Sequence, residues 1–209
     1  MHLPDGILPL NQSLIYWILT VIILIVSFYK FTKNPNKDKR VVAIAIFAVF
    51  MTVVSSISIP SPLGVPMHFF TVPLIVFLLG PNDANIVSFI SLLSQALLLG
   101  MGGIVSFGAN FLVIGFIITT TTSIVYKFFS TINSYYAIFI STLLGIMFAT
   151  FGQIIILVLS GTMTLYALLT VLVPFYLIIS IIEGILTVFI INFIKSIKPE
   201  ILENSIIKF

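Results

Sequence analysis

The stretch that decides the fold is HFFTVPLIVFLLGPNDANIVSFISLLSQALLL, residues 68–99. It is apolar apart from Gly80-Pro81-Asn82-Asp83 near its middle, and Gly-Pro pairs interrupt helices. If the chain continues through this point, residues 68–99 form one long helix. If it turns back at Gly80-Pro81, the stretch forms two helices, and the first of them is short.

Composition identifies the environment of these helices. Hydrophobic residues make up 60% of the 209 residues and charged residues only 7%, whereas soluble domains carry roughly 25% charged residues. We therefore predict an all-α integral membrane protein embedded in a lipid bilayer. The absence of cysteine excludes thiolate metal sites and disulfides. The net charge is +3. In a membrane protein a basic excess usually reflects lysines and arginines in cytoplasmic loops, so we expect no nucleic-acid partner.

The apolar runs were compared with the roughly 20 residues that a spanning helix needs. We predict a single transmembrane domain, 1–209, with an N-terminal segment 1–8. The predicted spans are about 13–31, 41–59, 68–79, 82–99, 104–126, 135–159 and 165–194.

The positions of the basic residues favour seven helices over six. With seven spans and the N-terminus outside, all nine basic residues lie on the cytoplasmic side, as the positive-inside rule requires. With six, four of them move outside: Lys127, Lys195, Lys198 and Lys208. We therefore expect the N-terminus outside and the C-terminus in the cytoplasm. A start without Lys or Arg and without a cleavage site indicates a retained terminus, typical of a prokaryotic plasma membrane protein.

This topology brings the two histidines, His2 and His68, to the outer face. The Met1 amine, the His2 backbone nitrogen and the His2 imidazole can close fused chelate rings on one ion, and His68 can supply a fourth nitrogen. Four nitrogens held nearly in a plane suit Ni(II) or Cu(II), and Co(II) less obviously. A lone histidine after an initiator methionine is, however, unremarkable.

Three polar residues are expected near this site. Asp5 lies in a turn and either accepts a hydrogen bond from the other His2 ring nitrogen or is an ordinary turn residue. Gln95 and Asn110 lie near the outer ends of their spans, where they either line a pocket below the terminus or bond between helices.

Glu183 is the one acid well inside a predicted span. Ionisable groups in hydrocarbon are functional-site candidates by default. A polar tether to a neighbouring helix, for example to Gln153 or Asn110, is slightly favoured over metal contact. Gly145 and Ala149 form a small-xxx-small face that is suited to helix packing.

Three kinds of function were considered. The first is a metal-binding subunit of an ATP-driven importer, and the second is a membrane scaffold or assembly subunit without metal. The third is a membrane-embedded metal-dependent hydrolase, which needs a general base that Asp5 and Glu183 are poorly placed to supply. The chain has no Walker-type phosphate loop, so ATP hydrolysis would have to come from partner chains.

The opening Met1-His2-Leu3-Pro4-Asp5-Gly6-Ile7-Leu8-Pro9 resembles the MHIPDGFL start of the CbiM/NikM family. The resemblance continues through the following segments: Ile59-Pro60, His68, Leu79-Gly80-Pro81, Gln95 to Gly100, Gly102-Gly103, Gly108-Ala109-Asn110 and Glu183 to Thr187. Members are the cobalt- and nickel-binding S components of energy-coupling factor (ECF) transporters. Departures include Met101, where an acid is common, and Tyr176, where a histidine is common.

The resemblance implies a seven-helix subunit that binds its metal through the Met1 amine, the His2 backbone nitrogen and ring, and His68. It implies no enzymatic activity and no cofactor of its own, with Co(II) or Ni(II) as transported substrate and a link to cobalamin biosynthesis. It also implies partners: a transmembrane coupling (T) subunit, two ATPase subunits and a small accessory membrane protein. Chelate geometry favours nickel, whereas cobalt is the commoner cargo of CbiM-like chains.

Overall fold

Five helices are long and apolar enough to cross a membrane, by length and composition. They are α1 (Leu10–Thr32), α2 (Lys37–Ser56), the continuous helix 107–129, α7 (Ser134–Leu159) and α8 (Leu165–Ile197). The computed structural model describes residues 2–57 and 68–203, and these ranges contain no strand. The protein is therefore an all-helical, multi-pass membrane protein. Met1 and residues 60–67, which join the second and third predicted spans, lie outside the described residues.

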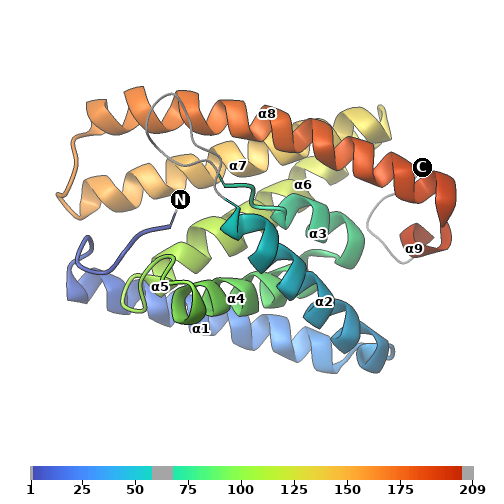
Figure 1. Ribbon diagram of the computed structural model, residues 1–209, viewed down its shortest axis with the longest axis horizontal. Coiled ribbons are helices and arrows are strands. Elements are labelled where there is room, and N and C mark those ends of the chain that lie inside the picture. Colours follow the sequence, from blue (N-terminus) through green and yellow to red (C-terminus); the bar gives the residue numbers. More distant parts are fainter. Residues whose placement is uncertain (1, 58–67, 204–209) are drawn as a thin grey trace.

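The long helices run roughly side by side, so the molecule has two ends (Figure 1). The N-terminal segment and the turn between α7 and α8 lie at one end. The turn between α1 and α2 lies at the other, together with the short α9 (Glu200–Glu203). Lys30 in the last turn of α1, Lys127 in the last turn of α6 and Lys195 in the last turn of α8 all belong to the second end.

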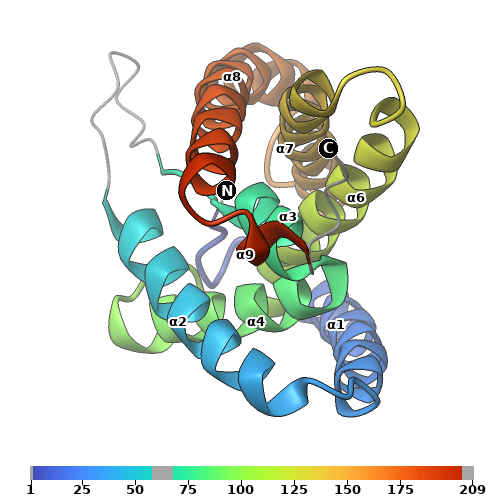
Figure 2. The ribbon, with the colours of Figure 1, turned by 90° about the vertical axis from the view of Figure 1, so that its right-hand side faces the viewer.

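The helical conformation is interrupted at Gly80, between α3 (Val72–Leu79) and α4 (Pro81–Leu98). Gly80 has φ +83, a left-handed conformation that favours glycine, and Pro81 then begins α4. Seen end-on, α3 lies in the middle of the helices (Figure 2). Val72 to Leu78 are all buried, although α3 alone measures only about 12 Å at 1.5 Å per residue.

Several helix ends differ from the sequence prediction. Helix α3 begins at Val72 instead of His68, because Thr71 has a left-handed φ of 57. Helix α1 begins earlier than predicted, at Leu10 after Pro9. The third long helix begins at Phe107 instead of 104, because residues 104–106 form a turn that Asp5 holds through hydrogen bonds.

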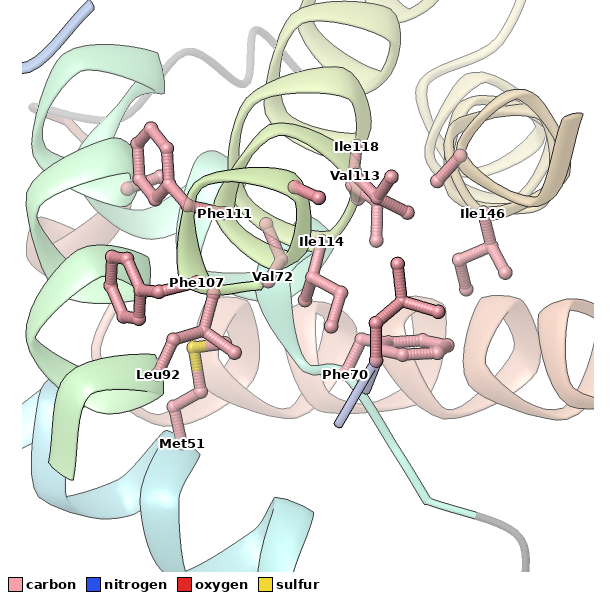
Figure 3. Close-up of a cluster of buried hydrophobic side chains, with 14 of the residues drawn as sticks. Met51, Phe70, Val72, Leu92, Phe107, Phe111, Val113, Ile114, Ile118 and Ile146 are labelled. Atoms are coloured by element: carbon pink, nitrogen blue, oxygen red, sulfur yellow. The ribbon is translucent and has the colours of Figure 1, made fainter. Parts of the chain in front are cut away.

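The helix 107–129 changes type along its length. It consists of α5 (Phe107–Asn110), the π-helix η1 (Phe111–Ile117) and α6 (Ile118–Phe129). The extra residue in each π turn rotates the side chains that follow, and such insertions are frequent at functional sites. Phe111, Val113 and Ile114 of η1 project into the apolar core between helices (Figure 3).

Two glycines let long helices approach closely. A Cβ at Gly108 would lie 2.5 Å from the backbone nitrogen of Trp17 in α1. A Cβ at Gly145 of α7 would lie 2.4 Å from Thr122 Oγ1 in α6. The face predicted from Gly145 and Ala149 therefore packs against α6, as small residues do between membrane helices.

Candidate metal centre

The N-terminal segment folds back onto the helices through Leu3. The Leu3 N–H donates to Asn110 Oδ1 at 2.7 Å, and Asn110 Nδ2 donates to the Leu3 carbonyl at 3.0 Å. The Gly103 N–H also donates to that carbonyl, at 3.1 Å. Asn110 is 3% exposed. The amide of Asn110 thus satisfies both backbone polar groups of the residue that follows His2.

Asp5 fixes the same segment to the loop before α5. Its carboxylate accepts hydrogen bonds from the Ile104 N–H at 3.0 Å and the Ser106 N–H at 2.9 Å. Ser106 Oγ donates to the Pro4 carbonyl at 2.8 Å. The carboxylate therefore orders the terminus through the loop, and the expected hydrogen bond to the His2 ring is not among its contacts.

Gly103 makes room for this arrangement. A Cβ at this position would lie 1.9 Å from Asp5 Oδ1 and 2.5 Å from the Asp5 backbone nitrogen. Any side chain at Gly103 would therefore push the N-terminal segment away from the loop.

The His2 side chain is half-buried beside Gly102 and Gln95. A Cβ at Gly102 would lie 3.6 Å from His2 Cδ2. Burial lowers the pKa of His2 to about 3, and the Gln95 amide acts in the opposite direction. Within the described chain, His2 Nε2 and Gln95 Oε1 are buried without a hydrogen-bond partner.

His68 approaches from the other side, held by the last turn of α2. Its Nδ1 lies 3.0 Å from the Ser55 carbonyl oxygen, which can only accept, so Nδ1 carries the proton. Ser55 Oγ donates to the Phe69 carbonyl at 3.0 Å. Nε2 of a neutral His68 therefore has its lone pair available for a metal ion.

The two imidazole rings meet at the N-terminal end of the bundle. Their centroids are 6.2 Å apart and their planes are at 81°. Among residues 2–57 and 68–203, no three His, Asp or Glu side chains gather closely enough to hold an ion.

A cavity of about 440 Å³ opens beside His2 between α7 and α8, at the end of these helices nearest the N-terminal segment. It is lined mainly by apolar residues such as Leu157, Leu168 and Val171, with Gln153 and Met163 among them. His2 forms part of its wall, so the candidate centre borders open space.

Glu183 lies deeper, on α8. Its carboxylate accepts from the Phe70 and Thr71 N–H groups at 2.9 and 2.6 Å. The prediction that Glu183 bonds to Gln153 or Asn110 was therefore wrong. Glu183 binds backbone N–H groups instead, and Asn110 binds Leu3. Tyr176, where a histidine was expected from the resemblance, is buried with its ring centroid 5.9 Å from that of Phe70.

Comparison with known proteins gives the family. The model of CbiM, described as the cobalt uptake substrate-specific transmembrane region, matches residues 2–201. The chain belongs to the CbiM family. It is 30% identical over 221 residues to the "Putative cobalt transport protein CbiM 1" of Methanocorpusculum labreanum, covering 98% of this chain and 93% of that protein. It is 28% identical over 211 residues to the "Cobalt transport protein CbiM" of Clostridium tetani, covering 97% and 88%.

Nickel proteins belong to the same group. The "Putative fused nickel transport protein NikMN" of Archaeoglobus fulgidus is 28% identical over 207 residues, covering 98% of this chain and 68% of that protein. A solved structure titled "Crystal Structure of an Truncated Transition metal Transporter" superposes with a TM-score of 0.86 at 26% identity. The superposition covers 94% of this chain and 99% of the other. The family therefore includes chains named for either metal.

The sequence did not indicate Ser55 or Ser106 as parts of this CbiM-family site. Ser55 acts mainly through its backbone carbonyl, which any residue could provide. Ser106 follows the glycine-rich loop, which is the one available signal that the backbone there approaches another segment closely.

Proposed function

We propose that this chain is the substrate-binding membrane subunit of an ATP-driven importer of nickel or cobalt. The observation that carries the proposal is the approach of His2 and His68. His68 is bonded to Ser55 of α2, and His2 precedes Leu3, which is bonded to Asn110. In this scheme the ion is substrate, taken up at the N-terminal end and passed inward.

The proposed ligands are the Met1 amine, the His2 backbone nitrogen, His2 Nδ1 and His68 Nε2. The first three close a five- and a six-membered ring on the ion, and the planar nitrogen set suits Ni(II). His68 is already the right tautomer, because Nδ1 donates to Ser55. With Nδ1 of His2 on the metal, the Nε2–H is the one ring group left to donate, and Gln95 Oε1 is the proposed acceptor, a common arrangement for metal-bound histidine.

The rings must move slightly for this to happen. Two imidazoles at right angles on one ion, with metal–nitrogen bonds of about 2.0 Å, have centroids about 4.5 Å apart. The observed separation is 6.2 Å. A closure of that size lies within the reach of the short segment that carries His2, so metal binding would draw the two histidines together.

The proposed topology has seven crossings, with the N-terminus outside and the C-terminus in the cytoplasm. Helix α3 covers only about 12 Å of the hydrocarbon thickness of about 30 Å, so residues 68–71 must supply part of the third crossing. The lysines that end α1, α6 and α8 lie opposite the N-terminal segment. Their positions support a cytoplasmic assignment for that end.

Energy for uphill transport would come from partners. We infer a transmembrane coupling subunit, two ATPase subunits and a small accessory membrane protein, in keeping with the family's energy-coupling factor architecture. The chain itself acts as a binding subunit and not as an enzyme.

Metal uptake by cells tests the proposal. Cells without their own nickel and cobalt importers would express the chain alone, the chain with its partner subunits, and the complex carrying His2→Ala or His68→Ala. The expected result is ATP-dependent uptake by the complete wild-type complex and loss of uptake with either variant. Equal uptake by the wild type and both variants would overturn the proposed site.

A further inference from the structure

The segment His68–Thr71, here called the strap, joins the candidate ligand His68 to the buried helix α3. Glu183 of α8 binds the strap through both carboxylate oxygens, Oε2 to the Phe70 N–H at 2.9 Å and Oε1 to the Thr71 N–H at 2.6 Å. Glu183 is 3% exposed. A carboxylate this deeply buried is costly unless hydrogen bonds compensate it.

The backbone of the strap explains why an acid is placed here. Thr71 has φ 57, the one positive φ of a non-glycine residue in the described chain. A β-branched residue in this conformation is strained. The turn points the consecutive N–H groups of Phe70 and Thr71 at one spot on α8, and a carboxylate can accept from both at once.

The strap is held on its other side by α2. Ser55 accepts from His68 through its carbonyl and donates to the Phe69 carbonyl through its hydroxyl. The Phe70 side chain lies in the apolar core beside α8 (Figure 3). The strap is therefore held from two sides. Helix α2 binds it at His68 and Phe69, and Glu183 of α8 binds it at Phe70 and Thr71.

We propose that Glu183 is a positioning residue for the metal ligand His68. By fixing the Phe70 and Thr71 amides, it holds the strap in the strained turn that presents His68 Nε2 toward His2. The inference rests on the proposed function, since it assigns a role within that metal site. In this proposal Glu183 acts through the strap, to which each of its carboxylate oxygens is hydrogen-bonded.

The variant Glu183→Gln tests whether the Glu183 carboxylate positions His68. Glu183→Gln keeps the size and polarity of the side chain, but replaces one acceptor oxygen with an amide donor that faces a backbone N–H. One strap hydrogen bond is lost and a repulsive contact replaces it. Ser180→Ala is the matched control, because Ser180 is buried on the same helix and its hydroxyl bonds only to Leu177 of α8.

The experiment is a double-mutant cycle in which purified chains are titrated with Ni(II). The chains are wild type, Glu183→Gln, His68→Ala, the double variant and Ser180→Ala. We expect Glu183→Gln to weaken binding about tenfold or more, as loss of a supporting residue does. The double variant should bind within about twofold of His68→Ala, because Glu183 acts only through His68. Ser180→Ala should bind like the wild type.

Visible absorption of bound Ni(II) gives a readout that general destabilisation would not change. Loss of His68 from the ion alters the ligand field, so the Glu183→Gln spectrum should shift toward that of His68→Ala. Wild-type affinity in Glu183→Gln, or an equal fold-loss in the wild-type and His68→Ala backgrounds, would overturn the positioning role. Equal binding by wild type and His68→Ala would instead overturn the proposed metal site, so the two failures are distinguishable.

If Glu183→Gln does not fold, amide hydrogen exchange of the wild type tests the same contact. The Phe70 and Thr71 amides should be protected in the metal-free protein, because both donate to Glu183. Exchange of these two amides at the rate of an open loop would overturn the proposal.

Discussion

Asn110 bonds to both backbone polar groups of Leu3, donating to its carbonyl and accepting from its N–H. The pair joins residues 107 positions apart and sets the position of the adjacent His2. Because both partners are buried, loss of either hydrogen bond leaves an unsatisfied polar group, which costs about 1–3 kcal/mol.

Replacing Asn110 should therefore weaken metal binding. Asn110→Ala removes both hydrogen bonds and releases the segment that carries His2, so Ni(II) affinity should fall about 10- to 100-fold. Asn85→Ala is the control, since Asn85 is also a buried amide but bonds to Ser27 of α1. Isothermal titration of both variants decides the matter, and equal affinities would contradict the role assigned to Asn110.

Gly103→Ala should prevent the N-terminal segment from docking. Its Cβ would overlap the Asp5 carboxylate and backbone, so the segment must move and the affinity for metal should fall sharply. Gly100→Ala provides the control, because Gly100 has φ +63 but no atom within 4 Å of the new Cβ. That variant should show backbone strain of about 1 kcal/mol with metal binding retained. Loss of binding in both variants alike would indicate loop strain instead of a steric conflict.

Gln95→Leu should weaken binding about tenfold by removing the acceptor for the His2 Nε2–H. Gln153→Leu is the matched control, because Gln153 also has a buried, unpaired amide oxygen and lines the neighbouring cavity. Titration with Ni(II) should leave the Gln153 variant close to wild type. An unchanged affinity in Gln95→Leu would refute the proposed hydrogen bond between the His2 Nε2–H and Gln95.

Affinity should rise with pH because metal ligands must lose their protons. Burial lowers the pKa of His2 to about 3, so the His2 ring is already neutral at pH 6–8. The terminal amine and the His2 amide then supply two protons per ion, and His68 at most one more. Calorimetry in buffers of different ionisation enthalpy measures this number. Release of four protons near pH 6 would contradict a neutral His2 ring.

The same shift makes the metal-free fold sensitive to acid. An unfolded His2 takes up a proton near pH 6.5, whereas the folded one resists protonation down to about 3. Its contribution to the free energy of unfolding is present above pH 6.5 and is lost as the pH falls from 6.5 toward 3. Thermal unfolding of wild type and His2→Ala across this range should show a smaller acid loss in the variant.

At the opposite end, Arg40 of α2 pairs with Asp83 of α4 and donates to the Leu79 carbonyl that ends α3. Arg40→Met should leave the buried carboxylate without its partner and cost about 3 kcal/mol of unfolding free energy. Ni(II) affinity should stay near wild type, since the pair is remote from His2. Differential scanning calorimetry and titration of the same sample measure both quantities, and unchanged stability would contradict this role.

Hydropathy and the Gly80-Pro81 break were enough to predict an all-helical membrane protein and the position of its central interruption, because burial of apolar runs in lipid leaves few alternatives. For Asn110 and Gln95 the sequence left two roles open, lining a pocket below the terminus or bonding between helices, and Asn110 binds Leu3 of the N-terminal segment. It could not show that Asp5 binds the loop at Ile104 and Ser106. That choice depends on the glycine-rich loop conformation, which no residue pattern specifies.

The partner of Glu183 was equally beyond prediction. The sequence shows an acid in an apolar run, which predicts some polar partner. The actual partners are two backbone N–H groups. They point toward Glu183 because Thr71 takes a left-handed conformation that its residue type disfavours. Nor does the run 111–117 carry any signal of its π-helical turns, since propensity barely distinguishes π from α geometry.

The most direct test of the terminal chelate is titration of the purified chain with Ni(II) and Co(II), beside the same chain with its Met1 amine acetylated. Acetylation leaves every side chain in place but removes the amine nitrogen as a metal donor. The account predicts one tightly bound ion for the wild type and a large loss of affinity for the acetylated chain. Equal affinities in the two proteins would contradict metal binding through the N-terminus.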